Sequence, residues 1–158
     1  MEDDDLQATV DHVAIDRLQR TYADLVNRRA WDELHKVFMP SVEITLDLVS
    51  RPTIELAGSD AFADFIAPAM ERFGFFEFVI LNSHIELWPN EDHSAATARM
   101  FMCELRTLVG ETERNDAFGL YRDRYVRAES GWRIAERRYQ SLAQFPAGTW
   151  YPLPDLGS

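Results

Sequence analysis

The chain has 158 residues and an acidic composition, with 27 Asp and Glu against 16 Lys and Arg and a formal net charge of −11. This length predicts one domain that can be stable without disulfides or a structural metal. Nucleic acids and anionic membranes require basic surfaces, so the charge argues against both as partners. The single cysteine, Cys103, excludes an internal disulfide and a multi-cysteine metal site.

Targeting and cofactor signals are missing from the sequence. No basic and then apolar leader opens the chain, and no apolar stretch approaches the ~20 residues of a membrane span. Four scattered histidines and one cysteine supply no set of metal ligands, and no Gly-rich phosphate-binding loop occurs. We therefore expect a cytoplasmic protein that needs neither a metal nor an organic cofactor.

The residue pattern in the first part of the chain predicts two helices. Residues 1–11 are acidic and polar and are interpreted as a flexible leader. Apolar residues then recur at helical spacing over 12–29, which predicts an amphipathic helix with Asp11 as its N-cap. A short second helix is expected over 31–38, ended by Pro40.

One strand and one helix are expected next. Apolar and polar residues alternate over 42–49, which predicts a half-buried strand. A third helix is expected over 60–73 with Ser59 as its N-cap. Pro68 inside this segment is expected to kink or interrupt the helix.

The pattern of the second half predicts four long strands, over 76–88, 95–109, 116–127 and 131–144. Short turns between them favour antiparallel pairing, with the helices on one face of the sheet. The sequence therefore predicts an α+β domain over residues 12–144, with the order α-α-β-α-β-β-β-β. A Pro-rich and aromatic extension follows over 145–158.

His84 is the best ionisable candidate for chemistry. Strict alternation over 76–88 places His84 on one face with Phe78, Ile80 and Asn82, and this face is apolar at one end and polar at the other. Such a face is typical of a pocket wall, and imidazole titrates near neutrality. The alternative is a core histidine that is satisfied by its neighbours.

Two further strands carry candidate residues. Gly119, Tyr121 and Asp123 share one face of the strand over 116–127. A glycine inside a strand marks either the close approach of a ligand or a bend in a curved sheet. Cys103 is interpreted as an inert buried thiol rather than a nucleophile, because nothing nearby in the sequence would lower its pKa.

Three stretches, taken in order, resemble one family. They are YADLVNRRAWDELHKVF, then NSHIELW followed by SAATARMFMCE, and then AFGLYRDRYVRAESGWRIAERRY. They resemble the SnoaL-like branch of the nuclear transport factor 2-like superfamily, over about residues 12–142. This resemblance implies an α+β barrel domain, in which a cone-shaped, curved antiparallel sheet packs on three N-terminal helices around an apolar pocket.

The resemblance also implies site residues. Dehydratase-like members pair a pocket histidine with an aspartate on the first helix. Carried over, the histidine is His84, the helix tyrosine is Tyr22, and the aspartate position holds Asn27. An amide can hydrogen-bond an imidazole but cannot stabilise the imidazolium. We therefore expect Asn27 within reach of a mostly neutral His84. The residues expected to contact substrate are Tyr121, Asp123, Gly119, Cys103 and Glu104.

Two classes of function follow from these residues. The first is a cofactor-independent lyase (dehydratase-like) or isomerase acting on a small apolar cyclic substrate, with His84 as acid–base and Tyr22 and Tyr121 as hydrogen-bond donors. If another group acts, Asp24, Asp47, Asp123 and Glu104 are available. The second is a non-catalytic ligand-binding protein or the small subunit of a ring-hydroxylating dioxygenase. Excess apolar residues on both faces of the late strands predict a homo-oligomer, a dimer or trimer, formed through the outer face of the sheet.

Overall fold

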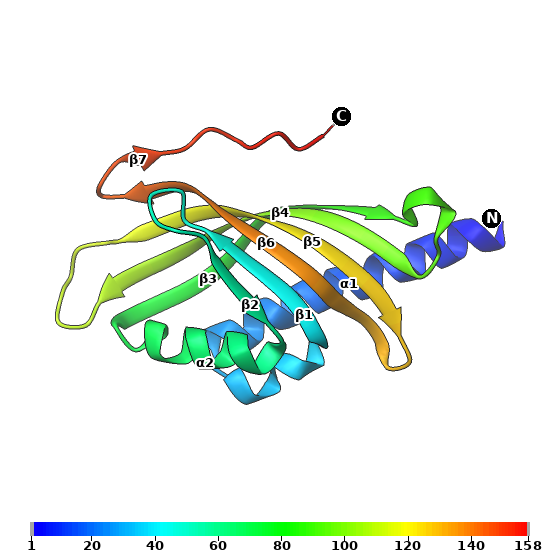
Figure 1. Ribbon diagram of the computed structural model, residues 1–158, viewed down its shortest axis with the longest axis horizontal. Helices are drawn as coiled ribbons and strands as arrows, with labels where there is room; N and C mark the ends of the chain where they lie inside the picture. The colour runs from blue at the N-terminus through cyan, green and yellow to red at the C-terminus, as the bar shows by residue number, and fades with distance from the viewer. Residues whose placement is uncertain (1, 158) are drawn as a thin grey trace.

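The computed structural model describes residues 2–157 and confirms the α+β architecture, with the helices packed on one face of a curved sheet (Figure 1). The helical segments are α1 (Asp3–Asn27), the 3-10 helix η1 (Trp31–Lys36), α2 (Ser59–Met70) and the 3-10 turn η2 (Pro89–Glu91). The strands are β1 (Phe38–Asp47), β2 (Ile54–Ala57), β3 (Phe73–Leu87), β4 (Ala95–Leu108), β5 (Asp116–Ala128), β6 (Gly131–Phe145) and β7 (Thr149–Trp150).

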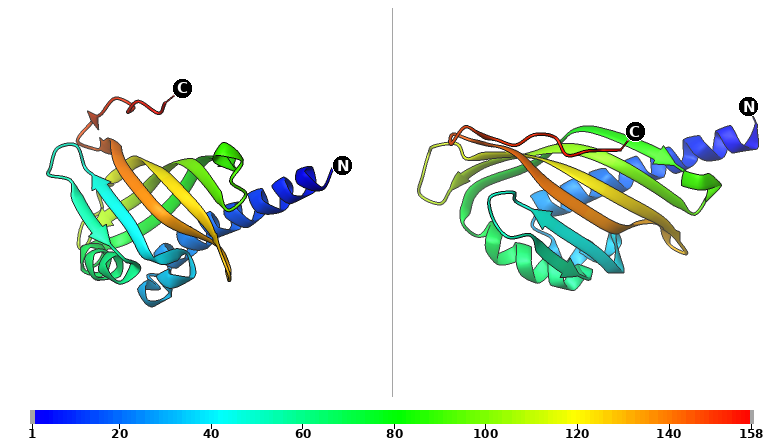
Figure 2. Two further views of the ribbon diagram at one scale, coloured as in Figure 1. Left: turned by 45° about the vertical axis from the view of Figure 1, so that its right-hand side comes forward. Right: turned by 45° about the horizontal axis from the view of Figure 1, so that its top comes forward.

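The sheet is mixed and open. Its strand order is β2-β1-β6-β5-β4-β3, with β7 paired to β6. All neighbours are antiparallel except β1 and β6, which are parallel. The predicted curved sheet packed on three helices is confirmed, but the parallel pairing of β1 with β6 makes the sheet mixed rather than wholly antiparallel. The chain returns to β1 only after the β3–β6 meander, and such a long crossover permits parallel pairing. The edge strands β2 and β3 do not pair, so the sheet curves around the helices without closing (Figure 2).

The first helix begins at Asp3, well before the predicted start. Three acidic residues, Asp3 to Asp5, occupy its first turn, where carboxylates favour the positive end of the helix dipole. Asp11 is therefore not an N-cap, and residues 3–11 are not an irregular leader. Asp11 lies inside the helix and is buried. The N-terminal part of α1 extends beyond the sheet in both views of Figure 2.

The second predicted helix is shorter than expected, and Pro40 does not end it. Helix η1 ends at Lys36, and Phe38 already begins β1. The pairing of β1 with β6 shifts register between Phe38 and Glu43. Pro40 falls in this irregular stretch, where its missing N–H costs no ladder hydrogen bond.

The third helix and the two shortest strands also differ from prediction. Helix α2 starts at Ser59 after Gly58 at the N-cap position, and it continues past Pro68 to Met70. Sequence patterning missed β2 and β7, which have only 4 and 2 residues. The extension is consequently not wholly irregular, because β7 pairs with β6 and the Tyr151 N–H donates to the Leu142 carbonyl at 2.7 Å.

The core lies between the sheet and α1. The predicted apolar stripe of α1 is confirmed, since Ile15, Leu18, Tyr22, Leu25 and Val26 are all buried. They pack against inward-facing residues of β1 and β3–β6. Within residues 2–157, no helix is long and apolar enough to cross a membrane.

Candidate functional site

A cavity of about 280 Å³ lies between α1, α2 and the inner face of the sheet. Its apolar wall combines aliphatic side chains with five phenylalanines, which are Phe62, Phe65, Phe73, Phe76 and Phe78. Residues of the β1–β2 turn, the β4–β5 connection and the C-terminal extension also line it, and they include Ser50, Asn115 and Tyr151. In Figure 1 the β1–β2 turn, the β4–β5 connection and the start of the C-terminal extension beside β7 lie at the same end of the sheet. The volume is near the lower end of the ~300–1,000 Å³ range of ligand pockets, which suits a ligand of one or two rings.

Tyrosine hydroxyls form the polar interior of the cavity. The hydroxyls of Tyr22 on α1 and Tyr121 on β5 are 3.3 Å apart and hydrogen-bonded. Two hydroxyls hold two protons and this contact uses one, so the pair can donate one hydrogen bond to a ligand. Burial raises the pKa of both phenols and raises that of Tyr139 on β6 to about 12. All three are therefore protonated donors at neutral pH.

A buried ion pair supports the two tyrosines from behind. The Arg137 guanidinium carbon lies 4.3 Å from the Tyr22 ring centre and 4.0 Å from that of Tyr121. Arg137 Nε and Nη2 donate to the two carboxylate oxygens of Asp123 at 2.8 and 2.7 Å. Asp123 also accepts from the Tyr125 hydroxyl at 2.7 Å. Asp123 is thus occupied within the core and does not line the cavity, contrary to prediction.

Glu104 of β4 supplies the carboxylate of the cavity. Arg106 Nη1 donates to Glu104 Oε2 at 2.9 Å, while Nε and Nη2 of Arg106 donate to the backbone and side-chain oxygens of Asn115 at 2.6 and 3.1 Å. Protein surrounds Glu104, yet 24% of its side-chain surface is accessible, because it faces the cavity. Burial raises the pKa of this carboxyl, and the opposing effect of the Arg106 charge is smaller. A carboxyl with a raised pKa that faces a cavity is a candidate group for proton transfer.

The predicted position of His84 on the cavity wall is wrong. Ile80 pairs with Met102 and Asn82 pairs with Phe101, so Leu81 is an extra residue in a β-bulge. The bulge reverses the alternation beyond it, because one inserted residue exchanges the two faces of a strand. The His84 side chain is 57% exposed on the outer face, 3.5 Å from Glu86.

Asn27 therefore does not meet His84. Its side-chain amide donates to the Phe78 carbonyl at 3.1 Å, and its side-chain oxygen accepts from the Phe78 N–H at 2.7 Å. The residue of β3 opposite the first-helix position is thus Phe78, and both members of the expected histidine–aspartate pair are replaced. Among residues 2–157, no histidine lines this cavity.

Gly119 and Cys103 have structural explanations. A Cβ on Gly119 would lie 2.2 Å from Cε2 of the Tyr139 ring, so the glycine makes room for a side chain rather than for a ligand. Cys103 pairs with Val79 and Phe118 and points away from the cavity, opposite in direction to Glu104. Burial raises the pKa of the Cys103 thiol, consistent with an inert buried thiol.

Replacing Gly119 with alanine should push Tyr139 into the cavity and lower the free energy of unfolding by about 1–3 kcal/mol. The cost should shrink in the Gly119→Ala, Tyr139→Leu double variant, because the smaller side chain relieves the clash. Urea denaturation of the two single variants and the double variant measures this coupling. Gly74→Ala is the control, since its Cβ would meet only ordinary contacts at 3.5 Å or more. Additive effects would contradict the packing described here.

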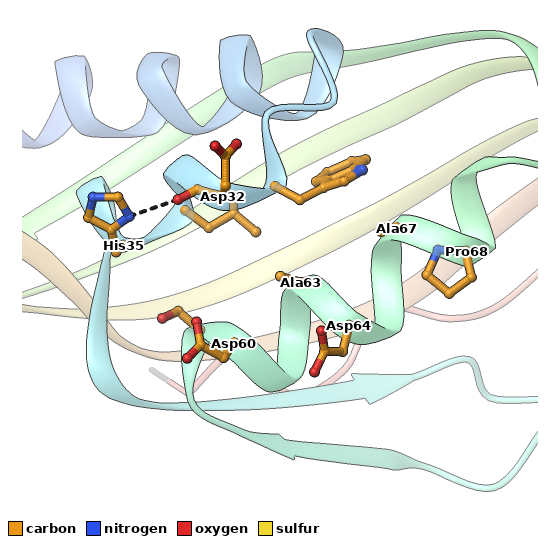
Figure 3. Close-up of a pocket in the computed structure, with 10 residues that line it drawn as sticks. Asp32, His35, Asp60, Ala63, Asp64, Ala67 and Pro68 are labelled. Carbon is orange, nitrogen blue, oxygen red and sulfur yellow. Dashed lines mark hydrogen bonds between the residues drawn. The ribbon is translucent and has the colours of Figure 1, made fainter.

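A second hollow, of about 520 Å³ and more open, lies between η1 and α2 (Figure 3). Asp32, His35, Asp60 and Asp64 line it. The Asp32 carboxylate points away from α2 (Figure 3), and His35 Nδ1 lies 3.0 Å from the Asp32 carbonyl. Within the described part of the chain, no three His, Cys, Asp or Glu side chains are grouped to hold a metal ion. The acidic groups of this hollow do not converge, and the first cavity is the candidate site.

Comparison with known proteins decides the family. The sequence model of a protein family, the SnoaL-like domain, matches residues 7–138, which is most of the chain. The chain belongs to the SnoaL-like domain family. A search of curated proteins found no match.

Solved structures support the same fold. A proposed scytalone dehydratase from Novosphingobium aromaticivorans is 18% identical, with a TM-score of 0.76 over 94% of this chain and 92% of that one. The hexachlorocyclohexane dehydrochlorinase LinA-type3 from Novosphingobium barchaimii is 18% identical, with a TM-score of 0.73 over 95% and 99% of the two chains. An NTF2-like protein with a cystatin-like fold from N. aromaticivorans is 20% identical, with a TM-score of 0.71 over 90% and 89%. At these identities the likeness establishes the fold alone, the cystatin-like fold of the last of these structures.

Sequence reasoning placed Tyr22, Tyr121 and Glu104 at the site but missed Tyr139 and Arg106. Glu136 pairs with Arg124 and Ile134 pairs with Tyr125, so Ala135 is an extra residue in a bulge of β6. Strict alternation from the buried Trp132 and Ile134 would therefore place Tyr139 on the outer face. Arg106 follows Glu104 at the spacing that places both on one face of β4. The two residues from turns, Arg51 and Arg72, carry no periodic signal at all.

Proposed function

We propose that this SnoaL-like protein binds a small, mostly apolar ring compound that carries an oxygen, and catalyses cofactor-independent proton transfer on it. Isomerase and lyase reactions both belong to this class. Glu104, rather than His84, is the acid–base group in this proposal. The observation that carries it is a carboxyl with a raised pKa in an aromatic cavity that also holds a tyrosine pair with a free proton.

In the proposed reaction, removal of a proton from carbon places negative charge on the ligand oxygen. The Tyr22–Tyr121 pair donates a hydrogen bond to the ligand oxygen, and the Glu104 carboxylate takes a proton from the neighbouring carbon. The C–H electron pair moves onto the ligand oxygen as an enolate, which the tyrosine proton stabilises. Return of the proton to a different carbon gives an isomer, and departure of a group from the next carbon gives a lyase product. A carboxyl with a raised pKa suits both directions of transfer.

A two-ring ketone tests the proposal without knowledge of the natural substrate. With 2-tetralone in D₂O, wild-type protein should accelerate deuterium incorporation next to the carbonyl, measured by mass spectrometry against buffer alone. Glu104→Gln should lower the protein-catalysed rate by about 100-fold, as expected for loss of a general base. Glu77→Gln is the matched control, because Glu77 is exposed on β3 and does not line the cavity. Equal rates for Glu104→Gln and wild type would refute the role of Glu104.

A non-catalytic pocket is the second candidate, either a ligand-binding protein or the small subunit of a ring-hydroxylating dioxygenase. The observation that favours it is the replacement of the expected histidine–aspartate pair by Phe78 and Asn27. The same experiment separates the two candidates. A protein that binds 2-tetralone, seen as line broadening in the ligand NMR spectrum, but never exceeds the exchange rate of buffer is a binding protein.

We also propose that the chain forms a homo-oligomer through the outer face and free edge of the sheet. Strand β3 is an edge strand, and its Phe75 and Leu81 side chains are exposed. Exposed apolar groups beside an unpaired edge favour association. Sedimentation at micromolar concentration should give a mass above that of the monomer, and Leu81→Lys should shift it toward the monomer. A single monomeric species of the wild type would contradict this.

A further inference from the structure

Positive charge gathers at the mouth of the cavity, although the protein as a whole is strongly acidic. Arg51, Arg72 and Arg106 all line the cavity, and Glu104 is its one lining carboxylate among the described residues. Arg51 lies in the β1–β2 turn, and Arg72 lies between α2 and β3. A cationic mouth on an acidic molecule indicates selection of charge in the ligand.

All three arginines line the same cavity, and two of them flank one aromatic ring. The guanidinium carbons of Arg72 and Arg106 lie 4.7 and 4.8 Å from the centre of the same Phe73 ring. Burial lowers the pKa of Arg72, and the charges of Arg106 and Arg51 lower it further. An anion bound beside these guanidinium groups would offset their repulsion.

Two of these arginines are free to bind a ligand. The guanidinium of Arg106 is committed to Glu104 and Asn115. Arg51 and Arg72 are exposed, and within residues 2–157 neither has a side-chain hydrogen bond or an ion pair. Their guanidinium groups present planar donor pairs, which match the two oxygens of a carboxylate.

We propose that Arg51 and Arg72 bind a carboxylate on the ligand, so that the molecule taken by the cavity is a small ring carboxylic acid. This inference rests on the proposed function and specifies its ligand class. The ring lies among the phenylalanines, and the carboxylate remains at the mouth. Glu104 in the same cavity disfavours a doubly charged group such as a phosphate monoester, because like charges repel.

The test compares 2-naphthoate with its neutral amide, 2-naphthamide, by isothermal titration calorimetry at pH 7 and moderate salt. Wild type should bind the naphthoate about tenfold more tightly than the amide, the scale of two charge-assisted contacts at a partly exposed site. Arg51→Gln and Arg72→Gln should each reduce this preference, and the double variant should abolish it without weakening amide binding. Arg138→Gln is the control, because it removes one exposed charge on β6 away from the cavity.

Each other outcome overturns a defined claim. Equal binding of the naphthoate and the amide by wild type would refute the carboxylate site and leave the ring-binding cavity in place. An effect of Arg138→Gln equal to that of Arg72→Gln would show general charge attraction and would also refute the site. Failure of wild type to bind either probe would refute the proposed ring-binding function together with this inference.

Discussion

Replacing Asp123 with asparagine is expected to lower the free energy of unfolding by about 3–5 kcal/mol, the cost of leaving one member of a buried ion pair unpartnered. The side chains of Arg137 and Asp123 are each 1% exposed, and both carboxylate oxygens accept from the guanidinium. An amide offers one acceptor where the carboxylate offers two. The positive charge of Arg137 would then remain buried against the rings of Tyr22 and Tyr121.

Urea denaturation measures this effect, with Glu86→Gln as the control. Glu86 also pairs with an arginine, Arg99 at 3.3 Å, but its side chain is 56% exposed. Exposed pairs contribute about 0–1 kcal/mol, so the control should unfold close to the wild-type midpoint. If Asp123→Asn lowered the free energy of unfolding by less than about 1 kcal/mol, the buried ion pair would not be a main support of the two tyrosines.

Replacing Asp11 with alanine is expected to cost about 3 kcal/mol, because it removes the shared acceptor of several buried donors. Asp11 is 1% exposed and accepts from the indole N–H groups of Trp88 at 3.0 Å and Trp132 at 3.2 Å, and from Arg127 at 2.5 Å. Asp16→Ala on the same helix is the control, since Asp16 makes only an exposed contact with Arg20. It should change stability by roughly 0.5 kcal/mol or less.

The contribution of Asp11 should also depend on pH. Burial alone would raise the pKa of Asp11, but the hydrogen bonds from Arg127, Trp132, Gln7 and Trp88 hold it below its ordinary value of 3.8. A carboxyl whose folded-state pKa is lowered stabilises the fold above its unfolded pKa and loses this contribution as pH falls through the folded value. The stability difference between wild type and Asp11→Ala should therefore be constant near neutrality and shrink below about pH 4. A difference that is unchanged down to pH 2.5 would contradict the network.

Hydrophobic spacing in the sequence predicted the helices and strands that bury one apolar face. The apolar stripe of α1 and the four long strands follow from spacing, because each must bury one face. The start of α1 was missed because its first turn is acidic and its N-terminal part extends beyond the sheet, where Leu6 and Val10 remain exposed. The pairing of β1 with β6 joins segments far apart in the chain, and no local pattern encodes such a register.

For the site residues too, strand alternation predicted some positions and misplaced others. Alternation predicted the face of Tyr121 and the family resemblance suggested Glu104, and both side chains line the cavity. His84 was misplaced by one inserted residue, Leu81, whose bulge depends on the pairing of β3 with β4 and not on composition. Asn27 was expected to meet His84, but its partner on β3 is the backbone of Phe78.

The central claim is that Glu104 is a proton-transfer group whose pKa the cavity has raised. Carbon-13 NMR titration of the Glu104 side-chain carboxyl measures this most directly, with the signal assigned by its loss in Glu104→Gln. The structure predicts a pKa above the ordinary value of 4.5, because burial outweighs the attraction of Arg106. A pKa at or below 4.5 would mean that the Arg106 pair keeps Glu104 an ordinary carboxylate, and would contradict its role in proton transfer.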